Sequence, residues 1–493
     1  MKKPLRGATL ALIAVSPFAH LACSDDSISG GGTFTLPTVD ASIAPVADAA
    51  PAVDASVDAP DADSGPATTA TVHLVTARKA PEANVKVVFY DAVGAVLGTE
   101  TTDATGQATH TMPAGGSVTA VFGTATESNL VTIQGVQPGD ALTMLDPARV
   151  FNVTFAVTAP VGALPGSAPH LSLRLGNCER GFATGQTVFM AVRYCGHPAD
   201  IATVVLTALD DSNVVVASTA QAAVTLIEDS VGTTAVTFAS PWVTSTTGTT
   251  TVTNVPTVGV FTNSNPLAQV GSSTGSGIDL VTIIDFRGSP ADLSNNEYMG
   301  SFSRLLPGAA FTQNEFDLVE TPRDGEGTVL GLVTRALVTR GAIAATTTLD
   351  FSTPLPAISS TAVAGGATPT VTWTSKAPLT GTKAIETFFT WFTGNNVGTW
   401  LVYAPPTATS IAPPSLPTAL VAFGPTAQSA YSSPPFVGAI DATFLPSYAT
   451  VRASAAALAP DRGLEEGAGY TVAPALPVDG TLRLTAFSLR NDD

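Results

Sequence analysis

The sequence predicts an all-β protein, with several β-sandwich domains in tandem behind a disordered N-terminal tether. Three observations lead to this prediction. Thr, Val, Ala, Gly, Pro and Ser dominate the chain after residue 70. Short runs such as TVHLVT, VKVVFY and SVTAVF alternate apolar and polar residues, and Gly, Pro, Asn or Asp bound each run. About 420 residues follow the tether, a length that predicts two or three domains.

Residues 1–22 have the features of a secretory signal peptide. Lys2, Lys3 and Arg6 precede a mostly apolar stretch. That stretch is shorter than the roughly 20 apolar residues that a membrane-spanning helix needs. The order of charge and apolar core is that of an export signal, so we expect this segment to be removed.

The end of this segment resembles the lipobox of bacterial lipoproteins. Leu21–Cys23 reads LAC, with a small residue directly before the cysteine. The resemblance implies that Cys23 becomes the lipidated N-terminus and anchors the protein in a membrane. Ser24 is not the aspartate of inner-membrane retention in enteric bacteria, which favours the outer membrane. His20 departs from the usual Leu, so a secreted protein without a lipid anchor is the alternative.

Residues 23–69 predict a tether. The stretch between Cys23 and Thr69 holds eight Asp and no Lys, Arg or Glu, and VDAS occurs twice, at Val39–Ser42 and Val53–Ser56. Such a segment buries too little apolar surface to offset the entropy of ordering. Its prolines favour extended polyproline II conformations, which hold a folded body away from a membrane.

The chain has three cysteines, so setting Cys23 aside leaves Cys178 and Cys195. An exported protein occupies a compartment in which disulfides persist, and these two residues form the obvious pair. A zinc site is the weaker alternative, because His197 is the only nearby histidine and paired CxxC spacing is absent.

Residues 70–145 read as a β-sandwich with two Asp-Gly turns, Asp91–Gly94 and Asp103–Gly106. In such turns the Asp side chain bonds its own backbone and Gly adopts the left-handed conformation. The strand VKVVFY, the T-D-x-x-G element and the turn at Pro113–Gly116 resemble carboxypeptidase regulatory-like modules, which have transthyretin-like or Ig-like folds. The resemblance implies an accessory, non-catalytic domain whose Asp and Gly residues are structural.

Two further β units are expected. Residues 146–266 predict a second sandwich with Trp242 in its core, and residues 278–493 predict a larger C-terminal β domain. Within the latter, residues 384–403 predict a hairpin across TGNNVG. AIETFFTWF has apolar residues at helical spacing as well, but its Thr and aromatic content favours a strand.

Candidate catalytic and metal sites are weak. GSSTG (Gly271–Gly275) matches G-x-S-x-G with Ser273 as nucleophile, but no helix follows, so a linker between β units is the preferred interpretation. DLSNNE (Asp292–Glu297) has alternating oxygen ligands but lacks the Gly and final Glu of a calcium loop. A Ser-His-Asp site or a carboxylate pair can assemble only in space, and both stay open. The histidines left after signal removal are His73, His110, His170 and His197.

The densest aromatic cluster lies in the expected hairpin. One face of it could stack on a sugar ring, with Trp391, Trp400 and Tyr403 facing the ligand, although core packing is the default for such residues. The cluster comprises Phe388, Phe389, Trp391, Phe392, Trp400 and Tyr403.

The net charge of −18 argues against a nucleic-acid partner. The sequence predicts no cofactor, no metal and no catalytic residue. The favoured function is that of a non-enzymatic cell-envelope lipoprotein, which binds a polysaccharide or protein at the cell surface or has a structural role. The alternative is a hydrolase acting on envelope or extracellular polymer, with accessory β-sandwich domains.

Overall fold

The computed structural model describes residues 68–454 and 480–488. Longer gaps fall at 146–151, 161–169, 192–200, 254–264, 285–300, 307–312 and 324–331, and short ones interrupt the rest. For the strands between residues 265 and 342, the structure gives the backbone and the strand pairing only. The described chain is nearly all β, as the composition predicts. In this part of the chain, no helix has the length and apolar character that a membrane crossing requires.

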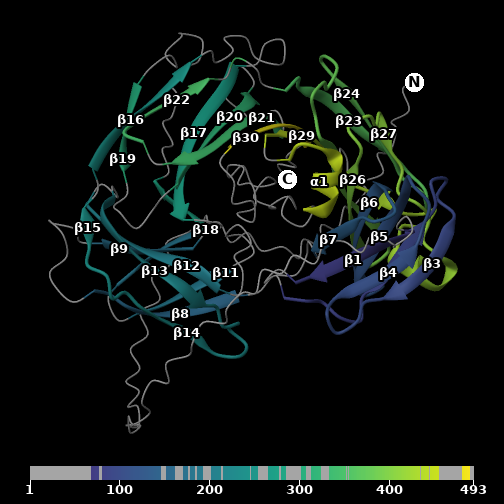
Figure 1. The fold of residues 1–493 in the computed structure, drawn as a ribbon, viewed down its shortest axis with the longest axis horizontal. Coiled ribbons are helices and arrows are strands. Elements are labelled where there is room, and N and C mark those ends of the chain that lie inside the picture. Colours follow the sequence, from purple (N-terminus) through teal and green to yellow (C-terminus); the bar gives the residue numbers. More distant parts are fainter. Residues whose placement is uncertain are drawn as a thin grey trace, which may run out of the picture. The chain divides into compact units, whose positions relative to one another are not determined.

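The first seven strands form two sheets. One has the order β4-β1-β7 and the other includes β3-β2-β5-β6 (Figure 1). The first strand begins at Thr69. The strands are β1 (Thr69–Val75), β2 (Lys86–Tyr90), β3 (Val96–Thr101), β4 (Gln107–Thr111), β5 (Gly116–Gly123), β6 (Glu127–Val136) and β7 (Ala141–Leu145).

The two Asp-Gly turns have the predicted geometry. Asp91 Oδ1 accepts the backbone N–H groups of Val93 and Ala95 at 3.0 and 2.8 Å. Asp103 Oδ1 accepts those of Thr105 and Gln107 at 2.8 and 3.0 Å. The Thr105 hydroxyl also donates to Asp103 Oδ1, at 2.7 Å, and this bond, followed by the one from the Gln107 backbone, lowers the pKa of Asp103. The closing glycines of both turns have positive φ, +84° and +74°, so the predicted turn geometry is confirmed.

The next strands build a second pair of sheets around their own core. The sheet orders are β10-β9-β12-β13-β15 and β11-β8-β14. Buried side chains such as Phe155, Leu173 and Leu206 fill the space between them, and Trp242 packs against this core while partly buried. The strands are β8 (Asn152–Thr158), β9 (His170–Leu175), β10 (Cys178–Phe182), β11 (Thr187–Ala191), β12 (Ile201–Leu209), β13 (Val215–Thr225), β14 (Thr233–Thr237) and β15 (Val243–Thr244).

The G-x-S-x-G match lies inside a strand. Ser273 belongs to β17, and this strand pairs with β18 on one side and β20 on the other. The interpretation of GSSTG as a linker is therefore wrong, and no strand-to-helix elbow forms there. The strands of this region are β16 (Thr246–Thr253), β17 (Asn265–Ser276), β18 (Asp279–Ile284), β19 (Ser301–Leu306), β20 (Gln313–Arg323), β21 (Leu332–Ala342) and β22 (Thr346–Asp350). In addition, β16 pairs with β19 and β22.

The predicted hairpin at 384–403 is confirmed. Strand β25 pairs antiparallel with β26 from Ile385↔Ala404 to Thr393↔Asn396. The remaining elements are β23 (Ile358–Ala364), β24 (Thr370–Ser375), β25 (Ala384–Thr393), β26 (Asn396–Ala404), β27 (Ser410–Ile411), the 3₁₀ helix η3 (Thr418–Phe423), β28 (Ala430–Tyr431), β29 (Phe436–Ala442), the helix α1 (Tyr448–Ala453) and β30 (Gly480–Ser488).

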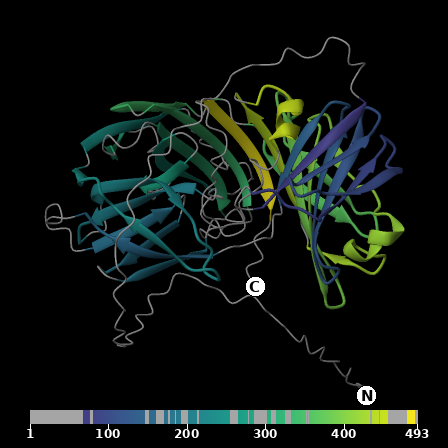
Figure 2. The same ribbon diagram turned by 60° about the horizontal axis from the view of Figure 1, so that its bottom comes forward.

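One long sheet joins strands that are far apart in sequence. Strand β26 pairs in parallel with β6, from Val397↔Glu127 to Tyr403↔Ile133 (Figure 1). Strand β30 pairs with β29 on one side and β21 on the other (Figure 2). The resulting order is β18-β17-β20-β21-β30-β29-β25-β26-β6-β5-β2-β3. Residues 70–145 and 384–442, which the sequence assigns to separate domains, thus share one sheet.

Apolar layers cover both faces of the middle of this sheet. On one face, strands β1, β4 and β7 and helix α1 enclose a core that includes Phe89, Ile133 and Val451. On the other face, β23, β24, β27 and η3 enclose a core that includes Trp400 and Leu420. We call these the α1-side core and the η3-side core. Strands buried on both faces have continuous apolar runs rather than alternation, which accounts for VVFY in β2 and LVTI in β6.

Candidate functional site

Helix α1 is a short helix with its own start signal. Ser447 has extended backbone angles, and its hydroxyl accepts the backbone N–H of Thr450 at 3.4 Å. A serine in this position caps an otherwise unpaired amide of the first turn. Arg452 lies in the last turn, where a cation complements the helix dipole. The local sequence therefore accounts for a helix of six residues that presents Tyr448 and Arg452.

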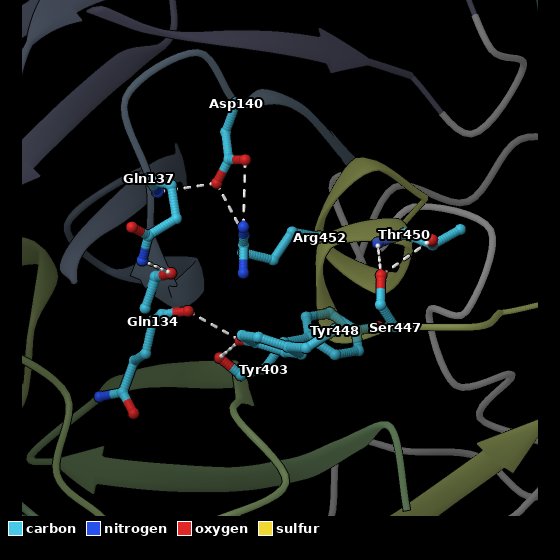
Figure 3. Close-up of polar contacts among 9 residues, drawn as sticks. Gln134, Gln137, Asp140, Tyr403, Ser447, Tyr448, Thr450 and Arg452 are labelled. Atoms are coloured by element: carbon cyan, nitrogen blue, oxygen red, sulfur yellow. Dashed lines mark hydrogen bonds and ion pairs between the residues drawn. The ribbon is translucent and has the colours of Figure 1, made fainter. Parts of the chain in front are cut away.

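An ion pair fixes α1 to the turn between β6 and β7. Arg452 Nε and Nη2 donate to the two carboxylate oxygens of Asp140 at 2.7 and 3.1 Å (Figure 3). The backbone N–H of Gln137 donates to Asp140 Oδ2 at 2.8 Å. The Arg452 and Asp140 side chains are only 7% and 16% exposed. A two-pronged contact of this kind sets orientation as well as attraction.

Tyr448 connects the same helix to two strands. Its hydroxyl lies 2.8 Å from the carbonyl of Gln134 and 3.0 Å from that of Tyr403, and donates to this pair (Figure 3). Its ring lies 5.1 Å from the Arg452 guanidinium carbon, within cation–π range. Burial raises the pKa of Tyr448 well above its usual value, although Arg452 acts in the opposite direction. The hydroxyl is therefore a permanent donor at ordinary pH.

A buried carboxyl lies in the α1-side core, on the same face of the sheet as Tyr403. Glu386 in β25 is directly paired with Tyr403 in β26. They are 4% and 1% exposed. Within the described structure, Glu386 Oε1 and the Tyr403 hydroxyl have no hydrogen-bond partner. Burial raises the pKa of Glu386 to about 8. Burial, and then the Glu386 carboxyl and Tyr448, raise the pKa of Tyr403.

A second ionic group lies on the opposite face of the same sheet. Lys383 Nζ is 3.7 Å from Asp441 Oδ1, and Arg483 contacts Asp441 Oδ2. Side chains alternate between faces along a strand. By this alternation, Lys383 and Asp441 lie on the same face as the η3-side core residues Ile385 and Ala439. Glu386 lies on the other face, with Ala384 of the α1-side core. The cations nearest to Glu386 along these strands are thus committed to another carboxylate.

A surface groove opens beside the β2–β3 turn. Its volume is about 370 Å³, and its lining includes Asp91, Ser117 and Gln134 together with the segment from Ala412 to Ser415. Gln134 Nε2 donates to the Ala412 carbonyl at 3.0 Å and so ties the two walls together.

The aromatic side chains proposed to face a ligand are core residues. Trp391, Trp400 and Tyr403 are 2%, 1% and 1% exposed, so none offers a face to a sugar ring. The reason is that β25 and β26 lie in the middle of the long sheet, where both faces are covered. The Trp400 indole N–H donates to Thr132 Oγ1 at 2.8 Å. Of the cluster, Phe392 is the member that is about half exposed.

The histidines that the structure describes do not meet. His110 contacts Glu100 through Nδ1 at 3.0 Å and lies against the Phe89 ring, while His73 is in β1 and His170 in β9. Among the described residues, no group of three or more His, Cys, Asp and Glu side chains is placed to hold a metal. His197 and the expected calcium loop at 292–297 lie outside the described residues.

The cysteine predictions also fall outside the described residues. Cys23 and Cys195 are not described, and of Cys178 the structure gives only its backbone position at the start of β10. Lipidation of Cys23 and the Cys178–Cys195 disulfide therefore stay predictions. The same holds for the signal peptide and for the tether up to residue 67.

Sequence reasoning missed the residues that form the site. Asp140 and Arg452 are 312 positions apart, and no local pattern links them. Glu386 did carry a signal, because it is the single charge within the apolar run AIETFFTWF. A lone charge in a strand that is apolar on both faces indicates a buried ionisable group.

Comparison with known proteins adds little. No protein-family model matches the chain, and no curated protein does. The Bacillus anthracis TIE protein matches at 9% identity, 58% of this chain, 50% of its own length and a TM-score of 0.15. BcpA, the major pilin subunit of Bacillus cereus, matches at 9% identity over 57% of this chain and 98% of its own, with a TM-score of 0.13. The shaft pilin SpaA of Lactobacillus rhamnosus GG matches at 8% identity over 58% of this chain and 96% of its own, with a TM-score of 0.14.

The chain thus spans half the length of the TIE protein structure. Scores this low carry no argument about what the protein does. The resemblance of residues 70–145 to carboxypeptidase regulatory-like modules accordingly rests on their strand and turn residues.

Proposed function

We propose that this protein is a non-enzymatic lipoprotein of the cell envelope, whose β-rich body has a structural or binding role at the cell surface. One observation carries the proposal. In the described part of the chain, the side chains best suited to chemistry serve cohesion. Arg452 and Asp140 fix a helix to a turn, and Trp400 and Thr132 join two strands of the long sheet. A body of this kind transmits position and load more readily than it turns over a substrate.

The N-terminal sequence supports the location. Cys23 follows an export signal and a small residue, and the segment to residue 69 is acidic and rich in proline. A chain of this composition extends by about 3.1 Å per residue in the polyproline II conformation, which is on the order of 100 Å for this tether. We place the lipid at Cys23, on the outer membrane, and the β-rich body at the end of the tether.

The test compares cells producing the wild-type chain with cells producing Cys23→Ala. Labelled palmitate should enter only the wild type, and protease added to intact cells should remove the wild-type body from the membrane fraction. Equal labelling of both chains would contradict the anchor. A body protected until the cells are broken would place the protein on the inner face of the membrane instead.

The non-enzymatic part needs a separate measurement. The purified wild-type chain is incubated with envelope glycans and with model esters, and both retention on the polymer and product release are followed. The proposal expects no turnover, with or without retention. Turnover that survives repurification would favour the alternative of a hydrolase on envelope or extracellular polymer.

A further inference from the structure

The buried pair of Glu386 and Tyr403 has no role in the proposed function. Both residues occupy the α1-side core, and each has an unpartnered oxygen there within the described structure. An ionised carboxylate without a partner is costly in an apolar core, whereas the protonated form is tolerated. The protonation state of Glu386 therefore affects the stability of the elements that enclose the α1-side core.

The groups that face this core define the electrostatics. Besides Glu386 they are Tyr403 from β26, Tyr448 from α1, the Arg452–Asp140 pair between α1 and the β6–β7 turn, and His110 from β4, which lies against Phe89 and contacts Glu100. Arg452 is already neutralised by Asp140, and burial is the cause of the high pKa of Glu386, which is about 8. The β1, β7 and β30 residues of this core, such as Val72, Leu142 and Leu484, are apolar. Among described residues, no cation is left over for the Glu386 carboxylate.

Among the described elements around this core, helix α1 is the one that belongs to no sheet. It has six residues, and Val451 belongs to the same core. Its Tyr448 hydroxyl binds the backbone carbonyl of Tyr403, which is directly opposite Glu386. The neighbouring β25, β26 and β29 are each held by ladders on both sides. Water therefore reaches Glu386 at lower cost by displacement of α1 than by opening of the sheet.

We propose that Glu386 is a proton-dependent latch for helix α1. With Glu386 protonated, α1 stays closed over the core, and Arg452 remains on Asp140. Loss of the proton to solvent favours a state in which α1 has moved away and the carboxylate is hydrated. Release frees the Asp140 turn and exposes the apolar side of α1, so the latch links alkaline pH to a local opening of the surface.

Hydrogen exchange on the full chain tests the latch. The opening constant of the peptide Leu445–Ser454, corrected for the intrinsic exchange rate, is measured from pH 5 to pH 8. Linkage predicts a rise of up to roughly tenfold for each pH unit, because the open state restores an ordinary carboxyl. In Glu386→Gln, which keeps the shape and cannot ionise, the constant should not change with pH.

Two controls separate the latch from general loosening. Tyr448→Phe removes a contact of α1, so it should raise the opening constant at every pH and keep the slope. A peptide from β12 (Ile201–Leu209), which belongs to a different core, should keep its protection throughout. The latch is overturned if wild type and Glu386→Gln have the same slope, or if the β12 peptide opens in step with α1.

Discussion

Single residues decide how firmly α1 is held. The Arg452–Asp140 pair is largely buried, with two hydrogen bonds. The His110–Glu100 contact is more exposed, at 25% and 41% for the two side chains. Desolvation makes a buried charge costly once its partner is removed, whereas an exposed pair contributes little. The two contacts therefore differ in energetic importance, although both join separate elements.

Arg452→Met keeps an unbranched apolar side chain, removes the guanidinium and leaves the Asp140 carboxylate unpaired. We expect the free energy of unfolding in urea to fall by about 3 kcal/mol. Glu100→Gln, the matched control at the exposed contact, should lower it by less than about 1 kcal/mol. Equal losses in the two variants would mean that the Arg452–Asp140 pair is as solvent-screened as a surface pair.

The pH dependence of stability provides a second residue-scale prediction. Burial raises the pKa of Glu386 to about 8, above its value of about 4.3 in an unfolded chain. The contribution of Glu386 to the free energy of unfolding is therefore fully present below about pH 4 and is lost as the pH rises towards 8. Glu386→Gln should remove this decline, measured as the difference in unfolding free energy between pH 5 and pH 8. A decline of the same size in both chains would assign it to other groups.

At the scale of elements, local signals were sufficient for turns and hairpins. The Asp-Gly turns and the β25–β26 hairpin depend on residues within a few positions of one another, so the sequence predicts them. Helix α1 and its contacts are different, because its anchoring partners Asp140 and Gln134 come from the first hundred and fifty residues. Ser447 marks a helix start only once the strands around it are known.

Gly398 in β26 shows how closely the hairpin packs. A Cβ at this position would lie 2.1 Å from Cζ2 of Trp391, its cross-strand partner. Trp391 is buried against Phe389 and Trp400, so it cannot move aside cheaply. Gly398→Ala should lower the unfolding free energy by about 1–3 kcal/mol, as overpacked cores do. Gly181→Ala in β10, where the nearest atom is 3.8 Å away, is the control and should change it little.

At the scale of the whole molecule, the long sheet is the feature that the sequence did not predict. Periodicity identifies a strand but not its partner, and the parallel pairing of β6 with β26 joins residues about 270 positions apart. The runs VVFY and LVTI did contain the information, since an isolated sandwich would alternate apolar and polar residues there. The resemblance to a self-contained module drew attention to the turns and away from these runs.

This arrangement predicts that residues 68–145 do not behave as an independent domain. Val88, Tyr90, Val121 and Leu130 belong to the η3-side core, whose other members come from residues 355–439. Cut out alone, the segment would expose these side chains as one apolar patch, which favours association.

We expect the fragment to self-associate in analytical ultracentrifugation. A fragment with Val88→Thr, Val121→Thr and Leu130→Thr should associate less, because the η3-side patch is interrupted while the fragment's own α1-side residues are unchanged. The same three changes in the full chain should destabilise it by several kcal/mol, since there they remove buried apolar groups. A wild-type fragment that is monomeric and unfolds cooperatively would show that residues 70–145 fold on their own, and that the shared sheet forms afterwards.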